Sequence, residues 1–530
     1  MKLNYNVKVD TDGGVRELNG SAEFEAILRL RLDLPAGHIL SAEASLSLTC
    51  SEDDRIFMNG FQSWSYCPEY RTTDKIRGIR HLPKPLIRYF GLDRYGDHYF
   101  LPYPDKPGLT HGESYCYFRS EERFRLFGSL DERPGYTLFI YDAAAGKLTI
   151  RRDCAGLSCG GEYAVFDLYF AEGAEDEVFD GWFKAMGVTA RTQEKIAGYT
   201  SWYNRYQKIS EKTILDDLRG CAKVLRPGDL FQIDDGWEPY VGDWLEADAK
   251  KFPRGMKPLA DEIHSRGLKA GLWLAPFIAQ RGSKLLKDHP DWRYKHDGKL
   301  WYCGSNWGGF YALDMDNPEV AEYLKETFRR VFDEWGFDLV KLDFLYAAAP
   351  FGDETESRAA RMMRAMELLR SFCGEKLILG CGVPLMPAFG LVDYCRIGCD
   401  VGLDWNDSWL MQQMIRERVS TKHSIGNTVF RRQLSGRAWI NDPDVFILRE
   451  DNVRLKPEEK RVLATVNSLF GGVLFCSDDM SAYPPEVRAF YEELLRNMKA
   501  EDIRVETKDG FKVSYAADGE RREIEIPEYE

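Results

Sequence analysis

The chain has 530 residues, a length at which two or three domains are expected. Its composition, with 44% hydrophobic and 29% charged residues, is that of an ordinary soluble globular protein. The formal net charge of −14 argues against a general nucleic-acid-binding protein, because phosphate recognition requires a positively charged face.

The sequence carries no signal for a membrane or for an oxidising compartment. It contains no run of 18 apolar residues, and residues 1–7 lack the hydrophobic region of a signal peptide. The 12 cysteines are scattered, as at Cys50, Cys116 and Cys476, and form no paired CxxC motifs. We therefore expect a cytoplasmic protein with reduced thiols and no membrane partner. The eight histidines are also scattered, so neither a metal nor another cofactor is expected.

The first 190 residues have the pattern of an all-β domain. Short segments rich in β-branched and aromatic residues alternate with turn signals, at 41–50, 122–130, 136–142, 147–152 and 162–170. This spacing predicts an N-terminal β-sandwich over residues 1–190. In its loop Met58–Tyr66, which holds the turn signal Asn59-Gly60, Trp64 either fills the sandwich core or reaches a pocket of another domain.

Residues 191–500 alternate predicted strands with predicted helices. The eight strands are 199–203, 229–234, 269–276, 338–344, 376–382, 392–400, 438–441 and 473–477. Eight such units, with nearly continuous apolar strands, predict a central catalytic (β/α)8 barrel. A doubly wound sheet is the alternative, but no glycine-rich phosphate turn follows the first strand. Residues 501–530 are predicted to form a short C-terminal β region.

The fourth strand, Phe337–Tyr346, carries two opposite charges. Lys341 and Asp343 point to the same side of this strand, because side chains alternate between its faces. Burying both charges costs several kcal/mol unless they are paired or face a pocket. They form either a structural salt bridge or part of a functional site.

The other predicted strands decide between these two interpretations. In (β/α)8 barrels the chemistry lies where the strands end. The residues found there are Trp202, Asp234, Asp235, Trp273, Lys341, Asp343, Cys381, Arg396, Asp400 and Asp442. So many carboxylates at neighbouring strand ends favour a functional site over structural caps. Arg396 and Asp400 share a face by alternation on the sixth strand and are predicted to join Lys341 and Asp343.

This set of side chains suits sugar chemistry better than metal or phosphate chemistry. Barrel metal hydrolases usually recruit histidines, and phosphate sites use a glycine-rich helix N-terminus. Paired carboxylates can act on a glycosidic bond as acid and nucleophile, other carboxylates accept hydrogen bonds from hydroxyls, and indoles stack on sugar faces.

These strand ends resemble those of the clan D α-galactosidases, and most closely glycoside hydrolase family 36. The matching stretches are Phe231–Trp237, Gly271–Pro276, Val340–Leu345, Leu379–Gly382 and Arg396–Asp400, together with the loop Asn59–Ser65. The resemblance extends over nearly the whole chain and is weak in the last 30 residues. It implies a retaining α-galactosidase.

The resemblance implies roles for two aspartates. Asp343 matches the nucleophile, which forms a covalent glycosyl-enzyme, and Asp400 matches the general acid and base. Asp404 is a rival for the second role, because both residues lie near Trp405. Asp400 is preferred because it follows the Arg396–Cys399 run directly.

The resemblance also implies contacts with the substrate. Asp234 and Asp235 match the acids that hold the 4- and 6-hydroxyls and would select galactose over glucose. Lys341 would keep the neighbouring nucleophile ionised, because a nearby cation favours the carboxylate.

Three tryptophans and two further residues complete the implied site. Trp202 and Trp273 match pocket walls, and Trp64 would reach in from the sandwich. Cys381 and Arg396 match positions near the 2-hydroxyl. The small turn around Cys381 favours a free 2-hydroxyl over the acetamido group of N-acetylgalactosamine.

The main hypothesis is an exo-acting α-galactosidase that acts on oligosaccharides of the melibiose or raffinose type. An α-N-acetylgalactosaminidase and an α-galactosyl transglycosylase are the enzyme alternatives, and a catalytically silent sugar-binding protein is the alternative from another class. The presence of both Asp343 and Asp400 argues against the silent protein. By resemblance a homo-oligomer is expected, although residues 503–530 leave little room for the family's usual C-terminal β-domain.

Overall fold

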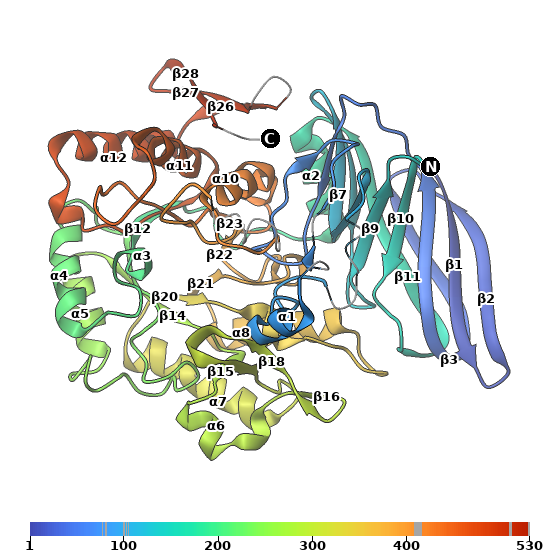
Figure 1. Cartoon of the computed structure of the whole chain (residues 1–530), viewed down its shortest axis with the longest axis horizontal. Coiled ribbons are helices and arrows are strands. Elements are labelled where there is room, and N and C mark those ends of the chain that lie inside the picture. The colour runs from blue at the N-terminus through green and yellow to red at the C-terminus, as the bar shows by residue number, and fades with distance from the viewer. Residues whose placement is uncertain are drawn as a thin grey trace.

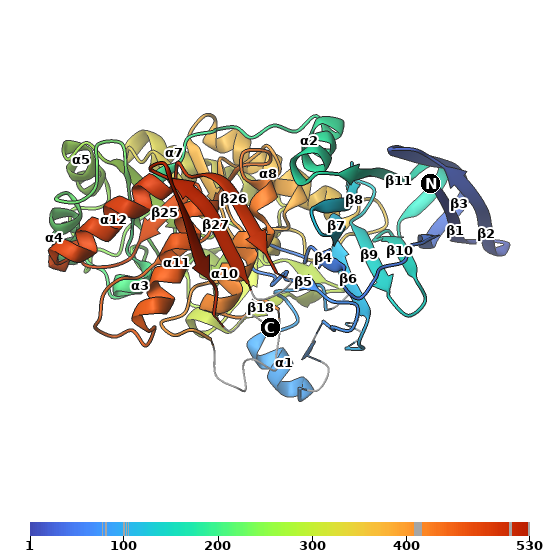
Figure 2. The same ribbon diagram turned by 90° about the horizontal axis from the view of Figure 1, so that it is seen from above.

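The computed structural model describes the chain except for residues 77, 80, 81, 99, 100, 102, 104, 407–415, 508–510 and 528–530. An antiparallel β domain lies beside a larger barrel of alternating strands and helices, with the N-terminus in the β domain (Figure 1). A small sheet formed by the C-terminal residues lies over the barrel helices (Figure 2). The predicted combination of sandwich, barrel and short C-terminal β region is confirmed.

The β domain consists of antiparallel strands and a short helix. They are β1 (Lys2–Thr11), β2 (Gly14–Glu23), β3 (Ile27–Ser47), β4 (Arg55–Met58), β5 (Glu69–Tyr70), α1 (Lys84–Phe90), β6 (Leu109–Glu113), β7 (Tyr115–Ser120), β8 (Arg123–Ser129), β9 (Thr137–Asp142), β10 (Lys147–Arg152) and β11 (Ser158–Gly173). The 21-residue strand β3 belongs to both layers of the sandwich. Its first half pairs with β11, and its second half pairs with β1 and β10. Gly37 lies at this crossover, where a Cβ atom would come within 2.0 Å of the Asp10 carbonyl oxygen.

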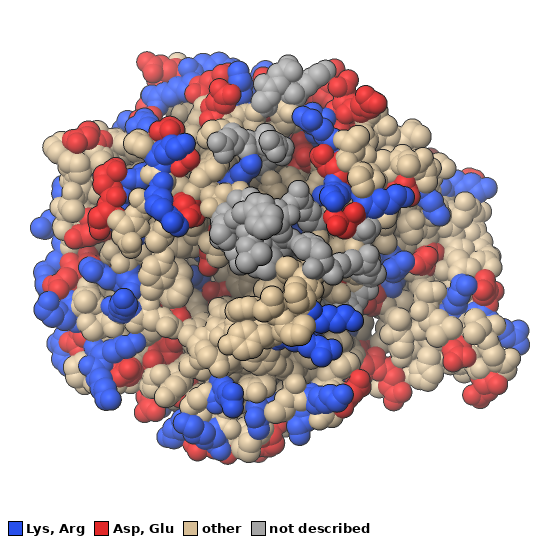
Figure 3. Space-filling model, in the orientation of Figure 1, with Lys and Arg blue, Asp and Glu red and all other residues tan. Residues whose placement is uncertain are grey.

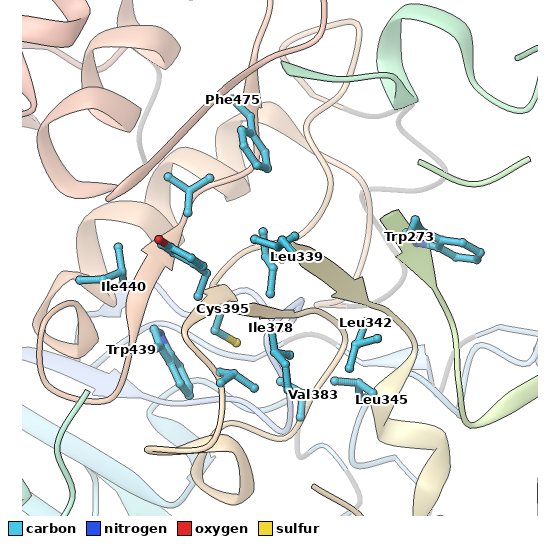
Figure 4. Close-up of a cluster of buried hydrophobic side chains, with 14 of the residues drawn as sticks. Trp273, Leu339, Leu342, Leu345, Ile378, Val383, Cys395, Trp439, Ile440 and Phe475 are labelled. Carbon is cyan, nitrogen blue, oxygen red and sulfur yellow. The ribbon is translucent and has the colours of Figure 1, made fainter. Parts of the chain in front are cut away.

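The barrel strands run parallel and follow one another around the sheet. They are β12 (Ile196–Thr200), β13 (Leu230–Ile233), β14 (Lys269–Leu274), β20 (Leu339–Leu342), β21 (Leu377–Gly380), β22 (Tyr394–Arg396), β23 (Ile440–Asp442) and β25 (Val473–Cys476), with β24 (Val445–Phe446) added beside β25. The Gly472 N–H donates to the Asn441 carbonyl at 2.9 Å, which joins the two ends of the sheet. Leu339, Ile378 and Phe475 belong to the buried hydrophobic cluster of the barrel (Figure 4).

Helices cover the outside of the barrel. They are α3 (Trp202–Arg205), α4 (Glu211–Cys221), α5 (Lys257–Ser265), α6 (Lys284–Asp288), α7 (Pro318–Arg329), α8 (Arg358–Cys373), α10 (Thr421–Phe430), α11 (Pro457–Phe470) and α12 (Pro485–Asn497). The helix α2 (Glu175–Met186) packs instead on β8 and β11 of the β domain. Their starts follow local capping chemistry, because Ser210, Ser357 and Ser420 each accept a hydrogen bond from a backbone N–H three residues on.

Three small sheets complete the fold. An excursion between β14 and α7 contains β15 (Ile278–Gln280), β16 (Lys295–His296), β17 (Lys299–Leu300), β18 (Tyr302–Gly304) and β19 (Phe310–Ala312). The C-terminal sheet contains β26 (Glu501–Glu506), β27 (Lys512–Ala517) and β28 (Glu520–Glu525). Phe511 stacks on Phe430 of α10 at a ring distance of 5.3 Å and so attaches this sheet to the barrel.

Two strands end before a residue that was predicted to lie at their end. The first ends at Thr200, so Trp202 begins the helix α3 instead of ending a strand. The sixth ends at Arg396, so Asp400 lies in the following loop and the expected alternation does not reach it. At Gly398 the chain packs against α10, where a Cβ atom would meet Ser424 at 3.4 Å. This contact leaves the chain close against α10 directly after the strand.

The loop from Asn59 to Cys67 joins the β domain to the barrel. Arg431, which is fully buried after α10, donates to the Asn59 side-chain oxygen at 2.9 Å and to the Ser63 carbonyl at 2.7 Å. It also donates to the Ile397 carbonyl of the barrel at 2.9 Å. One guanidinium therefore satisfies polar groups of both domains and fixes the loop that carries Trp64.

The surface is mixed in charge. Lysine and arginine side chains are interspersed with aspartate and glutamate over the face drawn in Figure 3, and that face is hollowed near its centre. None of the helices within the described residues has the length and apolar character needed to span a lipid bilayer.

The substitution Arg431→Met tests the role of the buried guanidinium. We expect it to lower the free energy of unfolding by about 3 kcal/mol or more, because several buried acceptors lose their donor. Thermal unfolding followed by circular dichroism measures this change. Arg454→Met is the control, since Arg454 is 80% exposed, and it is expected to have little effect. Equal unfolding midpoints for the two variants would contradict the prediction.

Candidate active site

A cavity of about 500 Å³ opens where the barrel strands end. Eight of the ten side chains predicted for the site line it, namely Trp64, Trp202, Asp234, Asp235, Trp273, Lys341, Asp343 and Asp400. Cys381 and Arg396 are buried directly behind the lining residues. The strand ends thus meet as the sequence predicts.

Asp343 follows β20 and is held in place through both of its carboxylate oxygens. Oδ2 accepts a hydrogen bond from Trp273 Nε1 at 3.1 Å, and Oδ1 accepts one from the Phe344 N–H at 2.9 Å. Phe344 has a φ of 55°, in the left-handed region that non-glycine residues rarely adopt. The bend after the strand therefore presents the carboxylate to the cavity, with a donor on each oxygen.

Lys341 lies between two aspartates. Its Nζ is 2.9 Å from Asp234 Oδ2, which also accepts a hydrogen bond from Gln232 Nε2 at 2.8 Å. Burial by itself would lower the pKa of Lys341, but the charges of Asp234 and Asp343 raise it overall. The lysine therefore stays protonated. Lys341 forms a buried salt bridge and also lines the cavity. Both sequence-based interpretations of its charge, the structural salt bridge and the functional site, therefore apply.

Asp235 receives donors that the sequence did not reveal. Its Oδ2 accepts from Gln207 Nε2 at 2.8 Å and from Trp307 Nε1 at 2.9 Å. Trp307 comes from the excursion between β18 and β19, where its φ is 54°. A strand-end rule cannot find either donor, because Gln207 follows α3 and Trp307 lies far from any barrel strand in the sequence.

Arg396 connects Asp400 to the barrel. Its Nη1 donates to Asp400 Oδ1 at 2.9 Å and its Nη2 to Asp444 Oδ1 at 2.6 Å. Asp444 also accepts from the Val401 N–H at 2.8 Å, and burial raises its pKa to about 7. Hydrogen bonds thus hold Arg396, which precedes Asp400, and Val401, which follows it. Asp404 pairs instead with Arg454 and is not among the described lining residues.

Trp64 extends from the sandwich into the cavity. Its Nε1 donates to Cys381 Sγ at 3.3 Å. At Gly382, where φ is 58°, a Cβ atom would lie 2.8 Å from the Trp64 ring. Of the two sequence-based interpretations, Trp64 therefore follows the one in which it reaches the pocket of another domain.

The cavity combines acids with indole walls. Five carboxylates face it together with four tryptophans and two basic side chains, namely Asp234, Asp235, Asp343, Asp400 and Glu417, then Trp64, Trp202, Trp273 and Trp307, and Lys341 and Arg418. Flat apolar walls with a few fixed polar groups suit a sugar ring, whose faces are apolar and whose rim carries hydroxyls.

Comparisons with known proteins agree with this site. The family model described as Melibiase matches residues 194–367. An α-galactosidase of Lactobacillus acidophilus is 31% identical over 153 residues, which are 27% of this chain and 20% of that protein. The aligned part thus spans about a fifth of that relative's length.

Solved structures match over more of the chain. The α-galactosidase of Thermus thermophilus in complex with p-nitrophenyl α-D-galactopyranoside has 28% sequence identity and a TM-score of 0.75, covering 97% of this chain and 98% of its own. A family 36 α-galactosidase of Geobacillus stearothermophilus, with 14% identity and a TM-score of 0.61, covers 94% of this chain and 70% of its own and shares the fold. The predicted resemblance of the chain to the α-galactosidases of glycoside hydrolase family 36 is confirmed.

Proposed function

We propose that the protein is a retaining, exo-acting α-galactosidase that removes terminal α-linked galactose from oligosaccharides of the melibiose or raffinose type. The observation that carries this proposal is the meeting of Asp343 and Asp400 in one cavity with the Asp234–Asp235 pair. The complexes of the Thermus thermophilus enzyme with an α-galactoside and with stachyose support the substrate class.

Hydrolysis proceeds in two steps. An oxygen of Asp343 attacks the anomeric carbon while the glycosidic C–O bond breaks and the proton of Asp400 passes to the leaving oxygen. Water then attacks the anomeric carbon of the glycosyl-enzyme, Asp400 takes the water's proton, and the ester bond to Asp343 breaks. Trp273 and the Phe344 N–H stabilise Asp343 as a carboxylate before attack and as a leaving group afterwards.

The remaining side chains bind the sugar. Asp234 and Asp235 accept hydrogen bonds from its 4- and 6-hydroxyls, and the tryptophans cover its apolar faces. Cys381 lies behind the Trp64 indole, so the two together limit the room beside the 2-hydroxyl. This arrangement favours galactose over N-acetylgalactosamine.

We further propose a division into a sandwich over residues 1–190, a barrel over 191–500 and a β region over 501–530, and an enzyme that acts in the cytoplasm. The reduced state of the described cysteines, ten of which are buried, supports that compartment. A homo-oligomer remains part of the proposal by resemblance to the family.

The two aspartates are assigned by the products of azide rescue. With p-nitrophenyl α-galactoside, Asp343→Gly is expected to lose roughly a thousandfold or more in kcat. Azide should restore turnover and give the β-galactosyl azide, because it attacks in place of the nucleophile. Asp400→Gly should give the α-galactosyl azide, because azide then attacks the glycosyl-enzyme. Proton NMR of the anomeric hydrogen identifies each product.

The control for this experiment is Asp404→Gly, which should retain nearly full activity. A β-azide from Asp400→Gly, or loss of activity in Asp404→Gly alone, would contradict the assignment.

Substrate choice separates the proposed enzyme from an α-N-acetylgalactosaminidase and from a catalytically silent sugar-binding protein. We expect kcat/KM for p-nitrophenyl α-galactoside to exceed that for the α-N-acetylgalactosaminide by roughly a hundredfold or more, because the acetamido group meets the wall formed by Trp64 and Cys381. Initial rates of p-nitrophenol release measure both values. Comparable values would favour an α-N-acetylgalactosaminidase, and binding of galactose without turnover of either substrate would favour a sugar-binding protein.

A further inference from the structure

Glu238 is a buried carboxyl group beside the cavity that the mechanism does not use. It lies in the loop after β13, five residues beyond the last residue of that strand, and is only 5% exposed. Its Oε2 accepts a hydrogen bond from the Gly236 N–H at 3.2 Å. Its carboxyl group is also hydrogen-bonded to that of Asp235.

A hydrogen bond between two carboxyl groups requires a proton on one of them. Asp235 Oδ1 is buried and receives no N–H or hydroxyl donor from the part of the chain that the structure describes. If both groups were ionised, two like charges would face each other in a medium of low polarity. One shared proton removes the repulsion and supplies the missing donor.

The surroundings place this proton on Glu238. Asp235 Oδ2 already accepts from Gln207 and Trp307, which stabilises its ionised form, whereas the described N–H donors give Glu238 one backbone contact. Burial and the charge of Asp235 raise the pKa of Glu238 well above its ordinary value. The other charges nearby are Asp234, which is paired with Lys341, and Lys251, whose Nζ donates to the Gly236 carbonyl at 2.9 Å.

We propose that Glu238 is a positioning residue that, as a neutral carboxylic acid, donates a hydrogen bond to Asp235 Oδ1 and so orients the Asp235 carboxylate for the hydroxyls of the bound sugar. The identity of that sugar rests on the proposed function, but the proton on Glu238 does not. A carboxylate can accept hydrogen bonds along four lone-pair directions. Asp235 has three donors from the protein, so it keeps acceptor capacity for the substrate.

Two substitutions at Glu238 separate this role from a structural one. Glu238→Gln keeps the shape, accepts from Gly236 and always donates to Asp235, so KM for p-nitrophenyl α-galactoside should stay within roughly threefold of the wild type. Glu238→Met has a similar size but no donor, so KM should rise roughly tenfold or more while kcat changes less. Glu246→Gln, an exposed position on the same loop, is the matched control and should match the wild type.

The proton itself is detected without any substrate. Above the ordinary glutamate pKa of 4.5 the unfolded chain carries both groups ionised, whereas the folded pair keeps one proton. Unfolding then releases a proton, so the wild type must lose stability as the pH rises from about 5 toward the folded pKa of the pair. Glu238→Gln has no proton to release. The unfolding midpoint of Glu238→Gln should therefore rise relative to that of the wild type as the pH increases across this range.

Each result supports or overturns the proposal. It is overturned if Glu238→Gln is as impaired as Glu238→Met, if Glu238→Met leaves KM unchanged, or if the two unfolding midpoints run parallel with pH. A wild type that hydrolyses no α-galactoside would refute the proposed function, and the pH dependence of unfolding would still decide the state of Glu238. Normal hydrolysis with parallel midpoints would refute only the role of Glu238.

Discussion

The constraint on which the rest of the structure depends is the excess of buried carboxyl groups over cations at the mouth of the barrel. Removing a charge from water costs several kcal/mol unless a partner compensates it. Lys341 compensates Asp234 and lies beside Asp343, while the guanidinium of Arg396 contacts Asp400, Asp442 and Asp444. Two cations thus compensate several carboxyl groups. The remaining stabilisation of these carboxyl groups comes from N–H donors and from bound protons.

The division of the acids into charged and neutral groups follows from this shortage. Asp343 receives hydrogen bonds from an indole and from a backbone N–H, so each of its carboxylate oxygens has a donor. Glu238 is buried and faces the charge of Asp235, which together raise its pKa and favour the neutral acid. The carboxyl groups at the barrel mouth therefore differ in the donors and charges around them, and burial beside Asp235 favours the neutral form of Glu238 in particular.

The sandwich takes part in the site through a single loop. Arg431 binds carbonyl groups of this loop and of the barrel at once, so Trp64 reaches the cavity from a fixed base. The contact of the Trp64 ring with Gly382 leaves no space for a side chain at that turn. The pocket wall near Cys381 is consequently shared by two domains, which explains why a loop remote in sequence carries a residue of the site.

The sequence predicted the site residues that lie at the ends of the barrel strands. Apolar strands ending in Asp234, Trp273 or Asp343 could be recognised because parallel strands bring their carboxyl ends to one edge. Asp400 was predicted both from strand alternation and from the resemblance, but the alternation does not apply to it, because β22 ends at Arg396. Gln207, Trp307 and Glu238 lie in loops whose path depends on tertiary contacts, and no local pattern marks them.

Backbone conformation explains why such residues escape a sequence pattern. Phe344, Trp307 and Asp444 have φ values of 55°, 54° and 74°, although none of them is a glycine. Each such conformation costs on the order of 1–3 kcal/mol and persists only where the surroundings hold it. All three lie beside a carboxylate of the site: Phe344 donates to Asp343, Trp307 donates to Asp235, and Asp444 shares Arg396 with Asp400. The rigid barrel therefore stabilises turns that local preference disfavours, and those turns aim the donors on which the charges of the site depend.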